Sequence, residues 1–221
     1  MTATATDAGA GPRRVIGAVL PDARRPGSVR VMVDGRPLLT LAAEAAAAEG
    51  LAAGQVLDHE RFERLSGAAD AEAAFRTALR LLGRRPFAER DLSRRLLQKG
   101  HPAAAVAQAM DKAGSLGLVD DECFARHYVE TRAARGRGPV RLRRDLLALG
   151  LAAALIDRTL AAVLQADDSA YPSVEALARK RLGQLKGLPP AVRRRRLVAY
   201  LARRGYGGDA VRTLVGKLLE R

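Results

Sequence analysis

RLRRDLLALGLAAALIDRTLAAV, residues 141–163, holds the spacing that decides the fold. Leu142 and Leu146 stand four residues apart, so they lie on the same face of a helix. Gly150 follows four residues later, where a glycine suits the left-handed cap that ends a helix. Ile156 then begins the apolar stripe of another helix. The stretch therefore predicts two helices joined by a tight turn.

The same spacing occurs three times in the chain, which indicates an internal repeat. Each copy has two leucines, a glycine and a further apolar residue at equal intervals. The three sets are Leu92, Leu96, Gly100 and Val106; Leu142, Leu146, Gly150 and Ile156; and Leu197, Leu201, Gly205 and Val211.

Each copy is preceded by a further apolar segment that predicts a helix, at residues 72–82, 121–135 and 172–184. Prolines stand at the breaks before the middle helices, where a helix start loses nothing by them. Units of about 50 residues bury too little surface to be stable alone, so neighbouring units are expected to pack on one another.

The chain before residue 71 shows a different pattern. Valines alternate at positions 29, 31 and 33 before Asp34 and Gly35, a dipeptide typical of a two-residue β-hairpin turn. Short helices are expected at 41–49 and 58–65. The expected organisation is a disordered tail, an extension with the hairpin and short helices, and three three-helix repeats. Their bounds are 1–12, 13–70, 71–119, 120–166 and 167–221.

These elements predict a mainly α fold. The repeats are expected to form an elongated, curved rod that carries a small N-terminal β-hairpin element and has no deep pocket.

The charge of the chain is large and unevenly distributed. Lys and Arg number 38 against 24 Asp and Glu, which gives a formal net charge of +14. Residues 1–70 carry 8 basic against 9 acidic residues, whereas residues 71–221 carry 30 against 15. A compositional drift would spread arginine evenly, so this distribution favours a polyanionic partner.

Arginines of the second and third units are therefore the candidate binding residues, because guanidinium groups suit both phosphates and carboxylates. Arg141, Arg143 and Arg144 lie off the leucine stripe and are expected to be exposed. The absence of Trp argues against a base-stacking platform for single strands. The candidates are Arg126, Arg132, Arg135, Arg137, Arg141, Arg143, Arg144, Arg193, Arg194, Arg195, Arg196, Arg203 and Arg204.

Catalytic and metal sites are not expected. Asp120, Asp121 and Glu122 are consecutive, so they point about 100° apart on a helix and cannot converge on one ion without partners. They are expected to cap the N-terminus of the helix that they begin. Cys123 and His127 could form a thiolate–imidazole pair or two metal ligands, but no second cluster completes either site.

The same residues suggest where the protein works. A single cysteine excludes an intramolecular disulfide, and the N-terminus lacks the order of a secretion signal. The longest uncharged apolar run, 146–156, is shorter than the about 20 residues that a membrane span needs. A cytoplasmic monomer without cofactor or membrane contact is expected.

Two segments carry a resemblance to a known family. LGLVDDECFARHYVETRAARGRGPVRLRRDLLALG, residues 116–150, resembles the signature of the bacterial RecX family, the regulators of RecA recombinase. ALRLLGRRPFAERDLSRRLLQKG, residues 78–100, is similar to that family's first-repeat pattern. The family usually has a serine cap and a glutamate where this chain has Ala88 and Asp91. The matching positions of the central motif are Leu118, Asp120, Asp121, Phe124, Ala125, Tyr128, Arg132, Gly138, Pro139, Leu142, Leu146 and Gly150.

The resemblance implies a negative modulator of RecA that lies along the groove of the RecA–DNA filament. It would contact several protomers and inhibit ATPase, strand exchange and co-protease activities, with weak, non-specific DNA binding. The alternative is a non-sequence-specific helical DNA-binding protein that acts independently of RecA. Sequence-specific reading is disfavoured, because the helices after the glycines offer few polar side chains. A nuclease that uses residues 120–122 would lack convergent carboxylates and a base.

Overall fold

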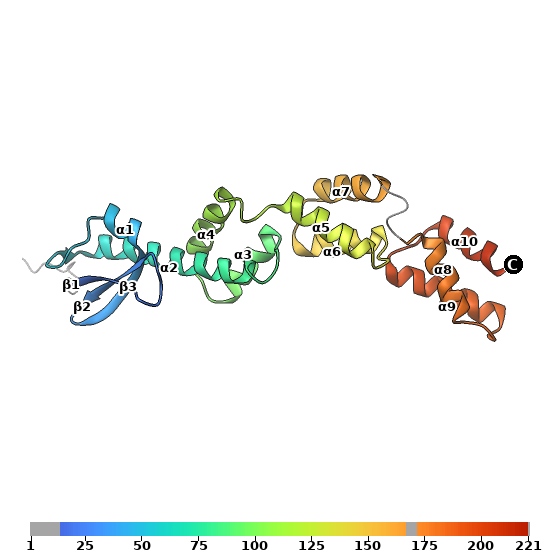
Figure 1. Ribbon diagram of the computed structural model, residues 1–221, viewed down its shortest axis with the longest axis horizontal. Helices are drawn as coiled ribbons and strands as arrows, with labels where there is room; N and C mark the ends of the chain where they lie inside the picture. Colours follow the sequence, from blue (N-terminus) through green and yellow to red (C-terminus); the bar gives the residue numbers. More distant parts are fainter. Residues whose placement is uncertain (1–13, 167–171, 221) are drawn as a thin grey trace, which may run out of the picture. The chain divides into compact units, whose positions relative to one another are not determined.

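The computed structural model describes residues 14–166 and 172–220 and divides into two compact units. The first unit comprises the residues up to 85 together with 92–118, and the second comprises 86–91 together with 119–221. The predicted disordered tail, 1–12, lies outside the described residues. Figure 1 labels the elements along the chain.

A four-stranded antiparallel sheet opens the first unit, with strand order β3-β2-β1-β4. The predicted hairpin is confirmed: Asp34 (φ 51°) and Gly35 (φ 73°) turn the chain between β2 and β3 through a left-handed conformation. The sheet is larger than the hairpin that the sequence predicted, since two further strands extend it. The strands are β1 (Arg14–Pro21), β2 (Ser28–Val33), β3 (Arg36–Ala42) and β4 (Val56–Leu57).

Two helices follow the sheet, α1 (Ala43–Ala48) and α2 (His59–Leu82). The prediction of separate helices at 58–65 and 72–82 was wrong, because α2 runs through without a break. No proline interrupts this segment, and the single Gly67 costs only about 1 kcal/mol in a helix interior. Leu65 packs into the sheet core while Ala74 and Ala78 are buried further along, so α2 is shared between the sheet and the first repeat.

The first repeat is completed by α3 (Glu89–Gln98) and α4 (Ala103–Ser115). Leu92 and Leu96 are fully buried, as the leucine spacing predicted. Small buried residues on both α2 and α4 let these helices pack closely; they include Ala74, Ala78, Ala105, Ala109 and Ala113.

The second unit holds two further three-helix repeats. Repeat 2 consists of α5 (Asp121–Ala133), α6 (Pro139–Leu149) and α7 (Ala153–Ala166). Repeat 3 consists of α8 (Val174–Gly183), α9 (Pro190–Arg204) and α10 (Asp209–Leu219). Both middle helices begin at a proline, in agreement with the sequence.

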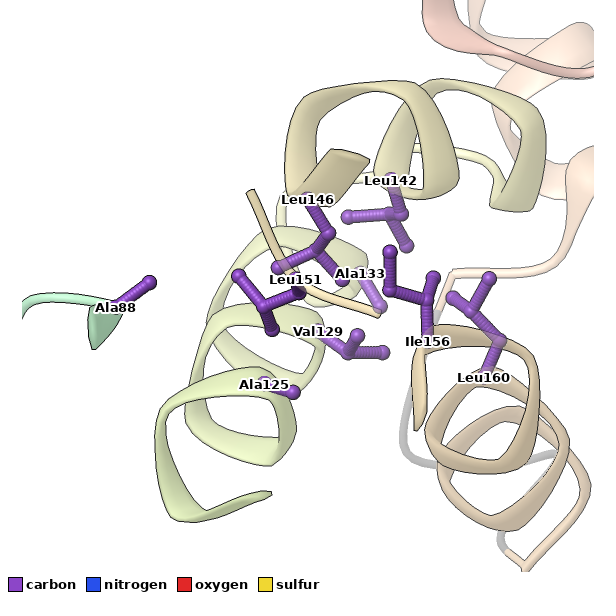
Figure 2. Close-up of a cluster of buried hydrophobic side chains, with 9 residues drawn as sticks. All are labelled: Ala88, Ala125, Val129, Ala133, Leu142, Leu146, Leu151, Ile156 and Leu160. Atoms are coloured by element: carbon purple, nitrogen blue, oxygen red, sulfur yellow. The ribbon is translucent and has the colours of Figure 1, made fainter. Parts of the chain in front are cut away.

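Each of these repeats has its own apolar core. In repeat 2, Leu142, Leu146 and Ile156 are fully buried with Val129, and Figure 2 shows these side chains gathered between α5, α6 and α7. In repeat 3, the core contains Leu197 and Leu201 together with apolar residues of α10. The predicted leucine stripes are therefore confirmed as core positions.

The repeated glycines cap their helices as predicted, since Gly100, Gly150 and Gly205 have φ of 87°, 96° and 92°. Two of them also make close packing contacts. A β-carbon at Gly150 would lie 2.6 Å from Cβ of Arg90, and one at Gly205 would lie 2.4 Å from both Cβ and the backbone nitrogen of Arg141. Each glycine thus abuts the first turn of the middle helix of the preceding repeat, a contact that we call the glycine joint.

No helix among the described residues is both long and apolar enough to cross a membrane.

Candidate polyanion-binding surface

The three consecutive acids at 120–122 have three different partners. Oδ1 of Asp120 accepts from the backbone nitrogens of Glu122 (2.8 Å) and Cys123 (3.0 Å), which confirms the predicted cap of α5. Oδ1 of Asp121 accepts from the backbone nitrogen of Glu89 (2.9 Å), at the start of α3. Glu122 pairs with Arg158, with 2.9 Å between Oε1 and Nη2.

These contacts turn the carboxylates away from a common centre. Within residues 14–166 and 172–220, no group of three or more His, Cys, Asp or Glu side chains could hold a metal ion. The Asp121 contact was missed by the sequence reasoning, which assigned this acid to its own helix. It supplies α3 with a cap that Ala88 lacks a side-chain oxygen to provide.

Asp120→Ala is expected to lower the free energy of unfolding by about 0.5–2 kcal/mol through loss of the α5 cap. Asp121→Ala is expected to cost a similar amount at α3, and the double variant should lose more than either single variant, because it removes the caps of two helices. Thermal unfolding followed by circular dichroism measures the change. Glu122→Ala is the control: its ion pair with Arg158 is 69% exposed on both sides and contributes little. A metal-dependent DNA cleavage that disappears in the double variant would contradict the structural role.

Other residues of α5 occupy ordinary positions. Cys123 and His127 are exposed. Phe124 and Tyr128 lie with ring centroids 6.0 Å apart, half-buried against the repeat 2 core, as their spacing predicted. Arg132 lies 5.0 Å from the centroid of the Tyr128 ring.

Three of the candidate arginines are paired with acids. Asp145 accepts from Nη1 of Arg137 (2.7 Å) and lies 3.2 Å from Nε of Arg141. Arg143 and Asp157 form a double hydrogen bond, at 2.8 and 3.3 Å, which holds the pKa of the Asp157 carboxyl below its usual value. These pairs leave less positive charge on α6 than its sequence suggested.

The expected exposure of α6 is corrected at one position. Arg143 and Arg144 are exposed, but Arg141 is half-buried. The guanidinium of Arg141 pairs with Asp145 on the same helix, and Gly205 packs against the β-carbon of Arg141. Helical spacing could place Arg141 off the leucine stripe, but it could not show that repeat 3 covers it.

A second set of arginines is exposed without an ion-pair partner among the described acids. Arg193 differs from the others because it is half-buried, and its Nε has no hydrogen-bond partner among the described residues. The exposed set comprises Arg126, Arg135, Arg144, Arg194, Arg195, Arg196 and Arg203.

Arg204 is a structural residue of the junction between repeats 2 and 3. Its Nη1 donates to the carbonyl oxygens of Arg135 (2.9 Å) and Gly136 (3.2 Å), in the turn that follows α5. The backbone nitrogen of Gly138 donates to the Arg204 carbonyl (2.7 Å). Burial at this junction raises the pKa of the Tyr206 hydroxyl. Repeats 2 and 3 are thus joined by backbone and side-chain hydrogen bonds.

A cationic pocket of about 490 Å³ opens beside this junction. It is lined by Arg135, Lys180, Arg181 and Arg204 around the Tyr200 ring, and no carboxylate is among its described lining residues. The guanidinium carbons of Arg204 and Arg181 lie 4.9 and 5.4 Å from the centroid of that ring.

Lys180 and Arg181 were absent from the sequence candidates. The sequence feature that could have identified them is the pair of adjacent basic residues in the predicted helix at 172–184. The sequence could not show that α8 faces the end of α5.

Family models match the three repeats in order. The first, second and third three-helix domains of RecX match residues 74–112, 120–160 and 171–215. The chain belongs to the RecX family. The resemblance of the central motif and the first-repeat pattern is thus confirmed.

Named relatives agree with this assignment. The regulatory protein RecX of Acidithiobacillus ferrooxidans is 36% identical over 146 residues, which cover 65% of this chain and 89% of that protein. The regulatory protein RecX of Halorhodospira halophila is 36% identical over 149 residues, which cover 66% of this chain and 88% of that protein. That of Thermobifida fusca is 37% identical over 147 residues, covering 64% and 76%.

Solved structures share the fold. A crystal structure of regulatory protein RecX has a TM-score of 0.73 at 20% identity and covers 94% of this chain and all of that one. RecX from Lactobacillus salivarius has a TM-score of 0.57 at 18% identity, covering 67% and 96%. The 94% coverage exceeds the share of the chain that the three repeats occupy, so the structural similarity includes part of the chain before the repeats.

Proposed function

We propose that this RecX protein is a negative modulator of RecA that binds along the groove of the RecA–DNA filament. It inhibits the ATPase, strand-exchange and co-protease activities of RecA and acts without catalysis of its own, as a cytoplasmic monomer. The observation that carries the proposal is the set of exposed arginines, unpaired with any described acid, on two consecutive repeats of a RecX chain.

Electrostatics supports a polyanionic target. Exposed guanidinium groups bind phosphate and carboxylate oxygens through charge-assisted hydrogen bonds, and each phosphate that they neutralise releases a counterion. The exposed arginines of α9 and the cationic pocket beside α8 both belong to repeat 3. Repeat 2 adds exposed arginines on α5 and α6. A surface of this kind suits a target that presents negative charge over a long distance.

Sequence-specific DNA recognition fits the structure poorly. The helix that follows each glycine, such as α4, would have to read base edges with polar side chains. The exposed residues in the first turns of α4 and α7 are alanines, Ala103, Ala104, Ala153 and Ala154. Non-specific binding to DNA without RecA is the second candidate function, because the same arginines would serve it.

Adding the full chain to cognate RecA on single-stranded DNA is expected to reduce ATP turnover at ratios well below one chain per RecA protomer. Few chains can then affect many protomers, which competition for free DNA cannot achieve. Binding of the same chain to DNA without RecA should be weak and should fall steeply with salt.

Two results separate the candidate functions. Unchanged ATP turnover together with tight binding to bare DNA would replace RecA modulation by DNA binding alone. Inhibition only when the DNA is saturated with the chain would lead to the same conclusion.

A further inference from the structure

A second basic pocket lies in the first unit, away from the candidate arginines. Its volume is about 540 Å³, within the about 300–1,000 Å³ that is typical of small-ligand sites. It is lined by the β1–β2 loop, by α2 and by His101, which lies two residues before α4. The charged and ring side chains that line it are Arg24, Arg25, Arg76, Arg80 and His101, and none of the acids in residues 14–166 and 172–220 lines it.

Arg76 connects α2 to the segment around the β1–β2 loop through hydrogen bonds. Its guanidinium donates to Oγ of the buried Ser28 and to the carbonyl oxygen of Pro26 (3.4 Å), both in the segment around the β1–β2 loop. Its Nε donates to Glu72 (2.7 Å), which neutralises its charge. Arg76 therefore shapes the pocket and leaves the other arginines to supply its positive charge.

A hydrogen-bond network on α2 orients two further donors. The Thr77 hydroxyl donates its single hydrogen to the carbonyl oxygen of Ala73 (2.9 Å) and accepts from Nη2 of Arg80 (3.0 Å). Nε2 of His101 lies 3.0 Å from the same oxygen and must therefore be the donor in that contact. The remaining N–H groups of Arg80 are left for another partner.

The charge of the pocket is largely uncompensated. Arg24 and Arg80 form no ion pair with a described acid, and Arg80 is exposed. Arg25 reaches Asp22 only at 3.9 Å, with its side chain 52% exposed. A concave site that gathers several guanidinium groups, with no carboxylate among its described lining residues, favours a compact anion with several oxygen acceptors.

We propose that this pocket binds a phosphate group, carried either by a small phosphate ester or by the DNA backbone. Arg24, Arg25 and Arg80 contact the phosphate oxygens, and Thr77 positions Arg80. The site is composite: its loop arginines precede residue 74, where the match to the first RecX domain begins, and Arg76, Thr77 and Arg80 lie within that match. The proposal does not depend on RecA modulation.

Calorimetric titration of the full chain with pyrophosphate tests the site. The variant Arg24→Gln/Arg80→Gln is expected to bind pyrophosphate at least about tenfold more weakly, because two charge-assisted donors are lost. The control variant Arg36→Gln/Arg84→Gln removes the same charge from exposed positions outside the pocket and should bind as the unchanged chain does. Thr77→Val, which keeps nearly the same volume, should weaken binding by a smaller factor.

A second titration with an oligothymidylate distinguishes the sources of the phosphate. Loss of both ligands in the pocket variant assigns the site to the DNA backbone, and loss of pyrophosphate alone assigns it to a small phosphate ester. Equal pyrophosphate affinity in the pocket and control variants, or no binding by the unchanged chain, overturns the proposal. RecA inhibition by the same variants is a separate readout, so failure of either proposal is visible without the other.

Discussion

Gly205→Ala is expected to destabilise repeat 3 by about 3 kcal/mol or more. The left-handed backbone at φ 92° alone costs an L-residue about 1–2 kcal/mol. The added methyl group would also lie 2.4 Å from the backbone nitrogen of Arg141, and a backbone atom of another helix cannot rotate away. Overpacking of this kind adds about 1–3 kcal/mol, and relief requires the glycine joint to open.

The other two repeat glycines provide matched controls. Gly100→Ala carries the same backbone cost, but nothing lies within 4 Å of its added methyl group, so the expected loss is about 1–2 kcal/mol. Gly150→Ala should be intermediate: the nearest atom to its added methyl group, Cβ of Arg90 at 2.6 Å, moves only with the backbone of α3, but no backbone atom is among the close contacts and Cγ and Cδ of the exposed Arg90 can rotate away.

Hydrogen exchange resolved along the chain is the suitable measurement, because a protein of several units need not unfold in one step. Protection should fall most in α9 and α10 for Gly205→Ala. Equal losses of protection for the three alanine variants would show that only the backbone conformation matters and that the glycine joint does not contribute to stability.

The second large effect concerns the arginines of α9. Arg194, Arg195 and Arg196 are all exposed, without an ion pair to a described acid. Their replacement by glutamine should weaken binding to RecA–DNA filaments by on the order of 100-fold near physiological salt, because each phosphate contact adds about 0.7–0.9 to the slope of log affinity against log salt. The slope itself should become shallower by about 2–3.

A charge-matched control separates a local contact from the loss of net charge. Arg36, Arg84 and Lys99 are exposed residues of the first unit, and their replacement by glutamine removes the same three charges. Binding measured over a range of salt concentrations should change little in this control. If both triple variants lose the same affinity and slope at equal helix content, the α9 arginines are not a specific contact surface.

The repeats could be predicted from the sequence because their determinants are local. A leucine pair four residues apart, a glycine at the helix end and a proline at the helix start act within one helix and its cap. The hairpin turn at Asp34 and Gly35 is equally local. These features determine the middle and last helix of each repeat and the buried leucine positions.

The remaining features depend on contacts between distant segments. The two-residue strand β4 has no pattern of its own and exists because it pairs with β1. α2 stays continuous through residues 66–71 because both of its halves pack against other elements. Asp121 caps a helix that begins 32 residues earlier in the chain. No local spacing could reveal these three features.

The candidate surface was predicted only in part, for the same reason. Sequence reasoning identified the basic repeats, but pairing with Asp145 and Asp157 removes three arginines from the exposed, unpaired set. Arg204 proved to be a donor to the end of α5. Arg24 and Arg80 meet in a pocket because the β1–β2 loop is fastened to α2, which charge counting along the chain cannot show.

The glycine joint gives the repeat array a direction. Gly100 belongs to the first repeat and has no earlier repeat to abut, so the space around it is open. At the other end, Arg196 precedes Leu197 just as Arg141 precedes Leu142, yet no described residue packs over it as Gly205 packs over Arg141. Arg141 thus contacts the following repeat, whereas the equivalent Arg196 is exposed to solvent. A comparison that treated the repeats as interchangeable would give these two arginines one role, although only the terminal one is available to another molecule.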